Sequence, residues 1–322
     1  MTRLKYDPWV LALHLVDASG TRRVAMSTQV LSEILGEVHR VDSMRTVHVR
    51  GIDSDPGEIA CLVDHGRMIA LAGFPKRVLF TTGEGMLRQE VEEVFRAFTS
   101  IEFSLPKSLR NELLPFQKSD STHREEEIER WLNTIEYYAR VKHTWQLAAE
   151  LTVRIPPGNL AIDLSDRLDR LAWRMSFRVQ RTGGASAFNL EQQQAEYGMK
   201  LCEEPYRVMT FSACGQMTAC SGDQRQRVYF GSLEEDTLRG IWESNSMESW
   251  RRNRTDGQCQ GCPGLGTTLR RPSLIGVYDS VGEQRFHEYP QQQLRKIAEQ
   301  TEQQSASRNS SSDFFRAPRK AS

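Results

Sequence analysis

The stretches CEEPYRVMTFSACGQMTAC (residues 202–220) and GSLEEDTLRGIWESNSMESWRRNRTDGQCQGC (residues 231–262) carry five of the chain's six cysteines. In the second stretch, Cys259 and Cys262 are separated by two residues, a spacing found in metal sites and in redox pairs. A redox pair normally opens a helix beside a strand. This pair instead has turn-forming neighbours, namely Asp256, Gly257, Pro263 and Gly264. The pattern therefore favours a metal site in a loop over a redox pair.

Two upstream thiols complete a set of four. Cys202 is followed by Pro205 and a β-rich run at 206–211, Gly215 permits a tight turn, and a second short strand carries Cys220 near its end. Such a hairpin brings these two cysteines to one end, where the later Cys-x-x-C loop can return. Four thiolates suit zinc or an iron-sulfur cluster. The gaps of 17 and 38 residues before the second and third thiols are wider than in most zinc fingers, which favours a cluster.

The chain before about residue 182 alternates β-rich runs with amphipathic helical stretches. The expected strands cover residues 10–16, 46–50, 77–81, 100–105, 149–155 and 172–180, and expected helices between them cover 29–41, 56–73 and 87–100. Strands with helices between them predict an α/β fold built on a parallel sheet or an open barrel. Residues 118–146 predict a long helix, whose acidic run we interpret as a solvated face.

Composition and charge exclude several classes of protein. The chain has 322 residues, of which 39% are hydrophobic and 26% charged, as in an ordinary globular protein. Lys plus Arg and Asp plus Glu both number 42, so the summed charge gives no reason to expect a nucleic acid or an anionic membrane as partner. The first twenty residues contain no apolar run long enough for a signal peptide or a membrane span, so we expect a cytoplasmic protein.

The cysteine-rich stretch resembles the C-terminal half of radical S-adenosylmethionine (radical SAM) enzymes that carry a SPASM or twitch domain. That family has C-x12-G-x4-C, then a glycine, a helix of the type L-x-x-I-W-x-S, basic residues and C-x-x-C in this order. The matching residues here are Cys202, Gly215, Cys220, Gly231, Leu238, Ile241, Trp242, Ser244, the Arg-rich segment 251–254, Cys259 and Cys262. The chain has no cysteine after Cys262. The resemblance therefore implies one auxiliary 4Fe-4S cluster, as in the shorter twitch type, with Cys202, Cys220, Cys259 and Cys262 as ligands.

The resemblance also implies a domain plan. Residues 1–182 would form a degenerate radical-SAM-like partial (β/α)6 barrel, and 183–275 a small cysteine-ligated α+β domain of the SPASM or twitch type. We expect a C-terminal helical extension at 276–302. Residues 303–322 are polar and Ser-rich, so we expect a disordered tail, with Phe314 and Phe315 as a docking handle.

The catalytic cluster motif of the family is missing. Radical SAM enzymes place C-x3-C-x2-C after the first strand, and the corresponding positions here are Ala18, Arg22 and Ala25. None of these side chains can ligate iron, and no cysteine precedes Cys61. Without an iron that has an open position, reductive cleavage of S-adenosylmethionine has no electron donor, so we expect no independent radical SAM activity. Arg22 and Arg23 put positive charge at this mouth of the barrel, where they could bind a carboxylate or a phosphate, or form a solvated loop.

Two segments resemble the parts of the family that bind the cosubstrate, although both depart from its pattern. The segment FTTGEGML (80–87) resembles the strand end that meets the ribose, which singles out Thr81, Thr82 and Gly83. The loop VRGIDSDPGE (49–58) lies where the family has its Gly-Gly-Glu-Pro loop for the methionine amine. Thr82 replaces the usual Asn and the acidic-proline loop is rearranged. These departures count against S-adenosylmethionine binding.

For four other residues we prefer a structural interpretation to a functional one. Cys61 lies in an apolar helical stretch and is read as a core cysteine, and Cys214 is read as a bystander beside the turn glycine. His14 and His48 fall on expected core strands and are read as hydrogen-bonded structural residues.

Three functions remain open. The first is a non-catalytic protein that keeps the auxiliary cluster and acts as a partner, a substrate-binding subunit or an electron relay for an active radical SAM enzyme, with a peptide or small molecule as substrate. The second is an enzyme with non-radical chemistry at the barrel mouth, for which the only candidate acids are Asp17, Asp53, Asp55, Glu58 and Glu84. The third is a binding protein stapled by zinc.

Overall fold

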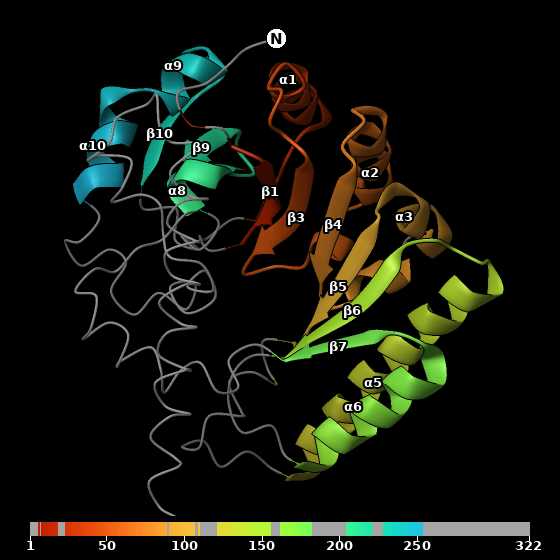
Figure 1. The fold of residues 1–322 in the computed structure, drawn as a ribbon. Helices are drawn as coiled ribbons and strands as arrows, with labels where there is room; N and C mark the ends of the chain where they lie inside the picture. The colour runs from red at the N-terminus through yellow and green to blue at the C-terminus, as the bar shows by residue number, and fades with distance from the viewer. Residues whose placement is uncertain are drawn as a thin grey trace, which may run out of the picture. The chain divides into compact units, whose positions relative to one another are not determined.

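The β-rich runs of the N-terminal half form parallel strands of one sheet in the computed structural model of the chain (Figure 1). The structure describes residues 6, 8–18, 23–88, 90–106, 109, 121–155, 162–181, 204–220 and 228–253. The parallel strands are β1 (Val10–Asp17), β3 (Thr46–Ile52), β4 (Lys76–Thr81), β5 (Ser100–Ser104), β6 (Glu150–Ile155) and β7 (Arg178–Arg181). The predicted α/β class with a parallel sheet is confirmed.

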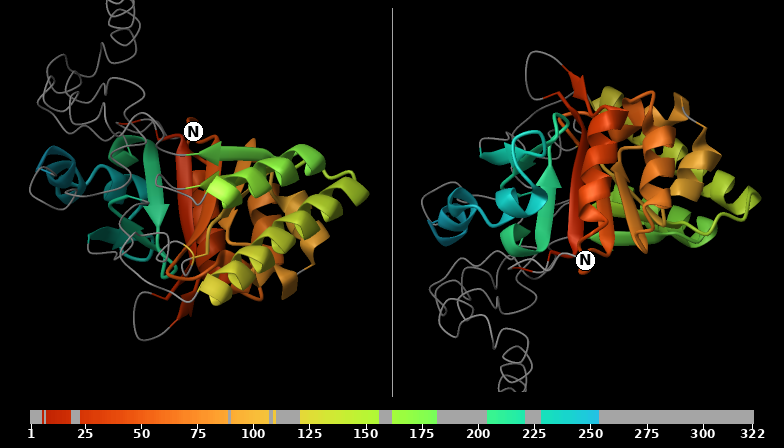
Figure 2. Two further views of the ribbon diagram at one scale, coloured as in Figure 1. Left: turned by 90° about the horizontal axis from the view of Figure 1, so that it is seen from below. Right: turned by 90° about the horizontal axis from the view of Figure 1, so that it is seen from above.

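Helices alternate with these strands. They are α1 (Thr28–Val38), α2 (Leu62–Leu71), α3 (Val91–Ala97), α5 (Ser121–Thr144) and α6 (Ile162–Met175), with single turns η1 (Pro56–Glu58) and η2 (Gly85–Arg88). In the sheet order β1-β3-β4-β5-β6-β7, each new strand is added on the same side of the last. Right-handed crossovers then place all the helices on one face, as the views in Figure 1 and Figure 2 show for α1, α2 and α3.

The helix-facing side of the sheet forms the core. Alternate strand residues there are fully buried: Leu11, Leu13, Val47, Val49, Leu79, Ile101, Phe103 and Val153. The Phe103 ring of β5 stacks on the Tyr138 ring of α5, with centroids 5.2 Å apart. On α1, the Ser27 hydroxyl caps the helix by accepting from the Val30 N–H at 3.2 Å, and the buried residues recur at helical spacing. Apolar periodicity therefore decides which face of each element is covered.

The cysteine-rich stretch begins as a continuation of the same sheet. After the single-turn helix α8 (Glu204–Arg207), β8 (Val208–Phe211) pairs in parallel with β1, from Val10 opposite Val208 to Leu13 opposite Phe211. β9 (Gln216–Thr218) and β10 (Tyr229–Ser232) then add antiparallel strands. The expected boundary at residue 182 falls before this shared sheet and stays a prediction.

Two short helices follow, α9 (Leu238–Trp242) and α10 (Asn245–Asn253), and a buried arginine fastens them to the rest. The Arg251 side chain is fully buried, with its guanidinium carbon 4.2 Å from the centroid of the Trp242 ring and 4.6 Å from that of Tyr6. Its Nε donates to the Pro205 carbonyl at 3.0 Å and its Nη1 to the Trp242 carbonyl at 2.8 Å. The Tyr6 hydroxyl donates to the Glu248 carboxylate at 2.9 Å. Arg251 therefore joins the start of the described chain, α8, α9 and α10.

Three predicted details were wrong. The first residues of the expected strand 172–180 are instead the last residues of α6. That helix continues this far because its buried residues recur at helical spacing, namely Leu164, Leu168, Leu171 and Ala172. Ser176 then adopts a positive φ of 55°, and only 178–181 is a strand. The expected strand 206–211 opens with the α8 turn. Cys61 is half-buried at the N-terminal cap of α2 and is not a core residue.

The expected helical extension at 276–302 and tail at 303–322 lie outside the described residues. None of the helices in the described part of the chain is long and apolar enough to cross a membrane.

We predict that Arg251→Met lowers the free energy of unfolding by about 3 kcal/mol, because two buried carbonyls lose their charged donor. Arg239→Met is the matched control, since Arg239 is 60% exposed and pairs with Glu243 on the surface of α9. We expect that variant to lose less than about 1 kcal/mol. Urea unfolding followed by circular dichroism measures both values. Equal losses in the two variants would contradict the role given to the buried guanidinium.

Candidate functional site

Of the four predicted thiolate ligands, Cys220 is the one that lies in the described part of the chain. It is half-buried and follows the end of β9 by two residues. Cys202, Cys259 and Cys262 lie outside the described residues, so the four-ligand set stays a prediction. Within the described ranges, no group of three or more His, Cys, Asp or Glu side chains is arranged to hold a metal ion.

The predicted hairpin that carries Cys220 is present. Gly215 has a positive φ of 80° and donates its N–H to the Ser212 carbonyl at 2.9 Å, which makes the tight turn between β8 and β9. A side chain at Gly215 would meet Val30 of α1, with its Cβ 2.8 Å from Val30 Cγ1. Cys214 is exposed in this turn, at the opposite end of β9 from Cys220. The position of Cys214 supports its interpretation as a bystander.

The loop after β1 folds back along its own strand. Val24 and Ala25 form the short strand β2 (Val24–Ala25), in which Ala25 pairs antiparallel with Val16. The next residue, Met26, is buried and donates its N–H to the Leu15 carbonyl at 2.8 Å. Of the three positions that match the missing cysteines, Ala18 follows β1 directly, Ala25 lies in β2, and Arg22 is outside the described residues. The two described positions, Ala18 and Ala25, therefore belong to the end of β1 and to β2, and neither side chain can bind iron.

Arg23 is paired. Its Nη1 lies 3.0 Å from a carboxylate oxygen of Glu58, and the Ser54 hydroxyl donates to the same carboxylate at 3.1 Å. Both charged side chains are more than one-third exposed. Arg23 therefore forms an exposed ion pair with an acid from the loop after β3, and neither anion binding nor a solvated loop is decided by this contact.

Asp55 joins the two predicted remnants of the cosubstrate site. Its buried carboxylate accepts hydrogen bonds from the Gly57 N–H at 2.7 Å, the Thr81 hydroxyl at 2.6 Å and the Thr82 hydroxyl at 2.8 Å. It also accepts from the Thr82 N–H. The loop 49–58 and the segment 81–83 are thus held together by one carboxylate, which we call the Asp55 node. The polar groups of Thr82 are already satisfied inside the chain.

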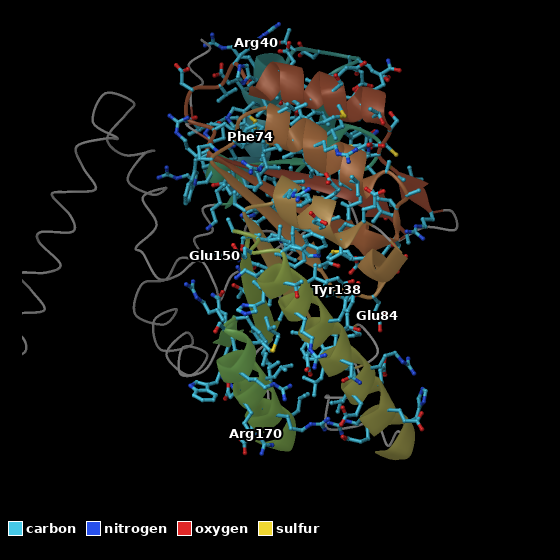
Figure 3. The ribbon with its side chains drawn as sticks, turned by 90° about the vertical axis from the view of Figure 1, so that its right-hand side faces the viewer. Arg40, Phe74, Glu84, Tyr138, Glu150 and Arg170 are labelled. Atoms are coloured by element: carbon cyan, nitrogen blue, oxygen red, sulfur yellow. The ribbon has the colours of Figure 1, made fainter. Side chains whose placement is uncertain are left out.

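Gly83 continues this node toward α5. Its φ is 91°, and an added Cβ would lie 2.7 Å from the Phe103 ring. Its carbonyl accepts from the Tyr138 hydroxyl at 2.7 Å, and Figure 3 shows Tyr138 of α5 beside Glu84. Burial raises the pKa of Tyr138, which keeps the donor protonated. The strand end 81–83 is therefore fixed by buried hydrogen bonds and by packing.

Four of the five candidate acids lie in the loops after β3 and β4. Asp55 and Glu58 are engaged as described, and Asp53 has a positive φ of 51° in the same loop. The Glu84 side chain is exposed, and partial desolvation, followed by the nearby Glu127 carboxylate, raises its pKa. Among the described residues these acids act as turn and loop residues.

The sheet has a second, polar face, which we call the inner face because it is turned away from the helices. Arg50 and His48 of β3 both contact the Phe80 ring of β4, with the Arg50 guanidinium carbon 4.1 Å and the His48 ring centroid 5.2 Å from its centroid. From β6, Arg154 also approaches this ring, at 5.3 Å, and forms an ion pair with Glu102 of β5.

His14 also lies on the inner face, beside Arg50, and among the described residues it is more buried than His48. It lies opposite Arg50 in the β1–β3 ladder and is 3% exposed. Burial, and then the Arg50 charge, lowers the pKa of His14 to about 3. Burial, followed by Arg50 and Arg154, lowers the pKa of His48 to about 3 as well. Both imidazoles are neutral near pH 7.

Sequence reasoning identified both histidines on core strands but missed the rest of the inner-face cluster. Its members are His14, His48, Arg50, Phe80, Glu102 and Arg154. The signal was present, because each charged residue interrupts an otherwise apolar strand at an alternate position. These residues come from five strands, and their assembly depends on strand order, which the periodicity alone does not give.

We predict that Asp55→Ala lowers the free energy of unfolding by about 3 kcal/mol, because buried Thr81 and Thr82 donors lose their acceptor. Asp64→Ala is the control, since Asp64 is 70% exposed on α2 and forms only a 3.5 Å pair with Arg67. Its expected loss is below about 1 kcal/mol. Chemical unfolding of both variants checks the difference, and a loss in Asp55→Ala no larger than the control would refute the node.

His14 should make stability sensitive to acid. Because its pKa is about 3 in the folded chain, the unfolded state binds a proton near pH 6.5 that the folded state does not. Stability is then complete above pH 6.5 and falls with decreasing pH, by about 1.4 kcal/mol per pH unit for one histidine. We predict that His14→Gln has a shallower slope between pH 6.5 and pH 5 than the unchanged protein. Identical slopes would show that His14 titrates normally.

Comparison with known proteins adds independent information on both halves of the chain. The family model SPASM, described as an iron-sulfur cluster-binding domain, matches residues 202–263, which include the four predicted cysteine ligands. Among curated protein sequences no relative matches.

Solved structures share the fold. Streptococcus suis SuiB bound to S-adenosylmethionine has a TM-score of 0.53 at 12% identity, over 86% of this chain and 75% of that one. SuiB bound to its precursor peptide SuiA gives 0.52 at 11% identity, over 86% and 74%. BtrN in complex with AdoMet and 2-DOIA scores 0.45 at 10% identity, over 78% and 87%. The family model therefore assigns residues 202–263 to an iron-sulfur cluster-binding domain, and the SuiB structures show that the chain shares their fold.

Proposed function

We propose that this protein is a non-catalytic radical SAM-fold subunit that holds one auxiliary 4Fe-4S cluster and serves an active radical SAM enzyme. Cys202, Cys220, Cys259 and Cys262 would be the cluster ligands. The subunit would bind or present the substrate of that enzyme, or relay an electron to it. Iron-sulfur chemistry of this kind needs a reducing compartment, so we propose the cytoplasm as its location.

The observation that carries the proposal is the loop after β1. No cysteine precedes Cys61 in the chain, and the described residues of that loop are the Ala18 backbone and the β2 strand containing Ala25. Neither alanine offers a donor atom for iron. A radical SAM enzyme needs three thiolates at this place, so the chain by itself lacks a means of reducing S-adenosylmethionine.

The Asp55 node supports the loss of the cosubstrate as well. Thr82 uses both its N–H and its hydroxyl on Asp55, and the Thr81 hydroxyl is also taken by this carboxylate. A ribose would have to compete with these buried, charge-assisted hydrogen bonds. The segment thus keeps its position at the strand end while its polar groups serve the fold.

The donor set fits an iron-sulfur cluster. Four thiolates saturate the cluster, so a cluster bound there would supply electron transfer or structural support and leave no open iron for a substrate. Cys220, the one predicted ligand in the described part of the chain, is half-buried after the end of β9. Zinc bound by the same thiolates is the alternative, and metal analysis separates the two. The non-radical alternative would use Asp55, Glu58 and Glu84, of which the first two add to the raised pKa of the third after burial and Glu127; Asp55 and Glu58 are, however, already engaged by groups of the fold.

We predict that anaerobically reconstituted protein contains about four irons and four sulfides per chain and is brown, as one 4Fe-4S cluster requires. Cys259→Ala should lose most of the iron. Cys214→Ala is the matched control and should keep it, because Cys214 is exposed in the β8–β9 turn, away from Cys220. Iron, sulfide and zinc counts with the visible spectrum give the answer.

Three outcomes would contradict the proposal. Colourless protein with one zinc would replace the cluster by a structural metal. About eight irons per chain would mean a second 4Fe-4S cluster and hence an unrecognised catalytic site. Formation of methionine and 5'-deoxyadenosine from S-adenosylmethionine by the isolated protein would exclude a non-catalytic role.

A further inference from the structure

Helix α6 buries one face and exposes another. Its buried leucines recur at helical spacing. Asp166, Arg170 and Trp173 follow one another at spacings of four and three residues and are all exposed, so they form a continuous stripe, which we call the α6 stripe. Trp173 is 88% exposed. Isolated apolar side chains on a surface are ordinary, so Trp173 indicates a partner only together with its surroundings.

A groove beside Trp173 runs between α5 and α6. Figure 3 shows the two helices side by side, with Arg170 on α6. The lining of the groove includes Leu132 of α5 and Arg170, Leu171 and Trp173 of α6. Leu132 and Leu171 are nearly buried, so an apolar floor lies next to the exposed indole. Trp and Arg beside such a floor are the residues that most often dominate the energy of a protein interface.

Ion pairs across the groove hold its two walls together. Arg167 of α6 pairs with Glu125 and Glu129 of α5, and Arg174 of α6 pairs with Glu136 of α5 at 2.9 Å. The surface is therefore formed before any partner arrives, which lowers the cost of ordering side chains on binding.

The α6 stripe carries two unpaired charges of opposite sign. Neither Asp166 nor Arg170 has an ion-pair partner in the part of the chain that the structure describes, although they stand one helical turn apart. Asp169, in contrast, pairs with Arg181 of β7 at 2.6 Å. A purely acidic or purely basic partner would neutralise only one of the two charges.

A second copy of the chain neutralises both. When two α6 helices lie antiparallel about a two-fold axis, Arg170 of one copy faces Asp166 of the other, and symmetry supplies the reverse contact. An isologous interface has to be self-complementary, and this order of charges along α6 is. Trp173, three residues further on, then faces the first turn of the other copy's α6.

We propose that two copies of this protein associate through their antiparallel α6 stripes. Exposed ion pairs contribute about 0–1 kcal/mol each, so burial of Trp173 supplies most of the affinity. The reciprocal Arg170–Asp166 pairs set the register and exclude other alignments. The interface uses no residue of the predicted cluster site, so it goes beyond the proposed function and does not depend on it.

Sedimentation velocity of the full-length, cluster-loaded protein at about 50 μM tests this interface, and we expect a dimer. Trp173→Ser should raise the dissociation constant about tenfold or more, because the anchor of the interface is lost. Leu71→Ser is the matched control, since Leu71 is 87% exposed on another helix, α2. We expect that variant to dimerise as the unchanged protein does.

Charge reversal tests the antiparallel register. Arg170→Asp places two acids opposite each other and Asp166→Arg places two arginines opposite each other. Each single variant should weaken the dimer about tenfold, because symmetry creates two repulsive contacts. The double variant restores both pairs with the signs exchanged, so it should recover the dimer. Circular dichroism checks that every variant is folded.

Three results would overturn the interface. Unchanged protein that stays monomeric would exclude a second copy and leave the α6 stripe to another kind of partner. A dimer that tolerates Trp173→Ser would show that the contact lies elsewhere on the chain. A double variant as weak as the two single variants would contradict the reciprocal pairing of Arg170 with Asp166.

Discussion

The parallel pairing of β1 with β8 is the constraint on which the rest of the structure depends. β1 has the barrel strand β3 on one side and the first strand of the cysteine-rich stretch on the other. One ladder therefore sets the position of Cys220 relative to the inner face, because β9 is in turn paired with β8. The aromatic pocket around Arg251 fixes the following helices to the same region. The described start of the cysteine-rich stretch is therefore joined to the N-terminal strands by a continuous hydrogen-bonded sheet.

At the predicted mouth of the barrel, the polar side chains of the loops bind one another. Asp55 binds Thr81 and Thr82, and Arg23 binds Glu58, so the loops after β1, β3 and β4 are tied to one another. The Asp55 contacts are charge-assisted and largely buried, whereas the Arg23–Glu58 pair is exposed, so the Asp55 contacts contribute more to holding these loops together.

The inner face shows the opposite behaviour. There the chain keeps buried polar groups at His14 and Thr210 without partners among the described residues, and it stacks two guanidiniums on Phe80. An unsatisfied buried polar group costs about 1–3 kcal/mol, so this arrangement opposes folding in the free protein. The two regions therefore differ in how the described residues satisfy their polar groups.

Much of this protein follows from its sequence alone. Apolar alternation predicted the parallel strands, and the cysteine spacing and the Leu238–Ser244 pattern pointed to the domain that the family model matches. Periodicity misplaced the strand at 172–180, since a short apolar run fits a helix end equally well. Only the tertiary structure decided that Asp55 meets Thr82, that Arg23 meets Glu58, and that His14, Arg50, Phe80 and Arg154 share one face. The reason is physical: these contacts join residues of different strands and loops, and strand order and register, which create them, are set by packing and not by local sequence.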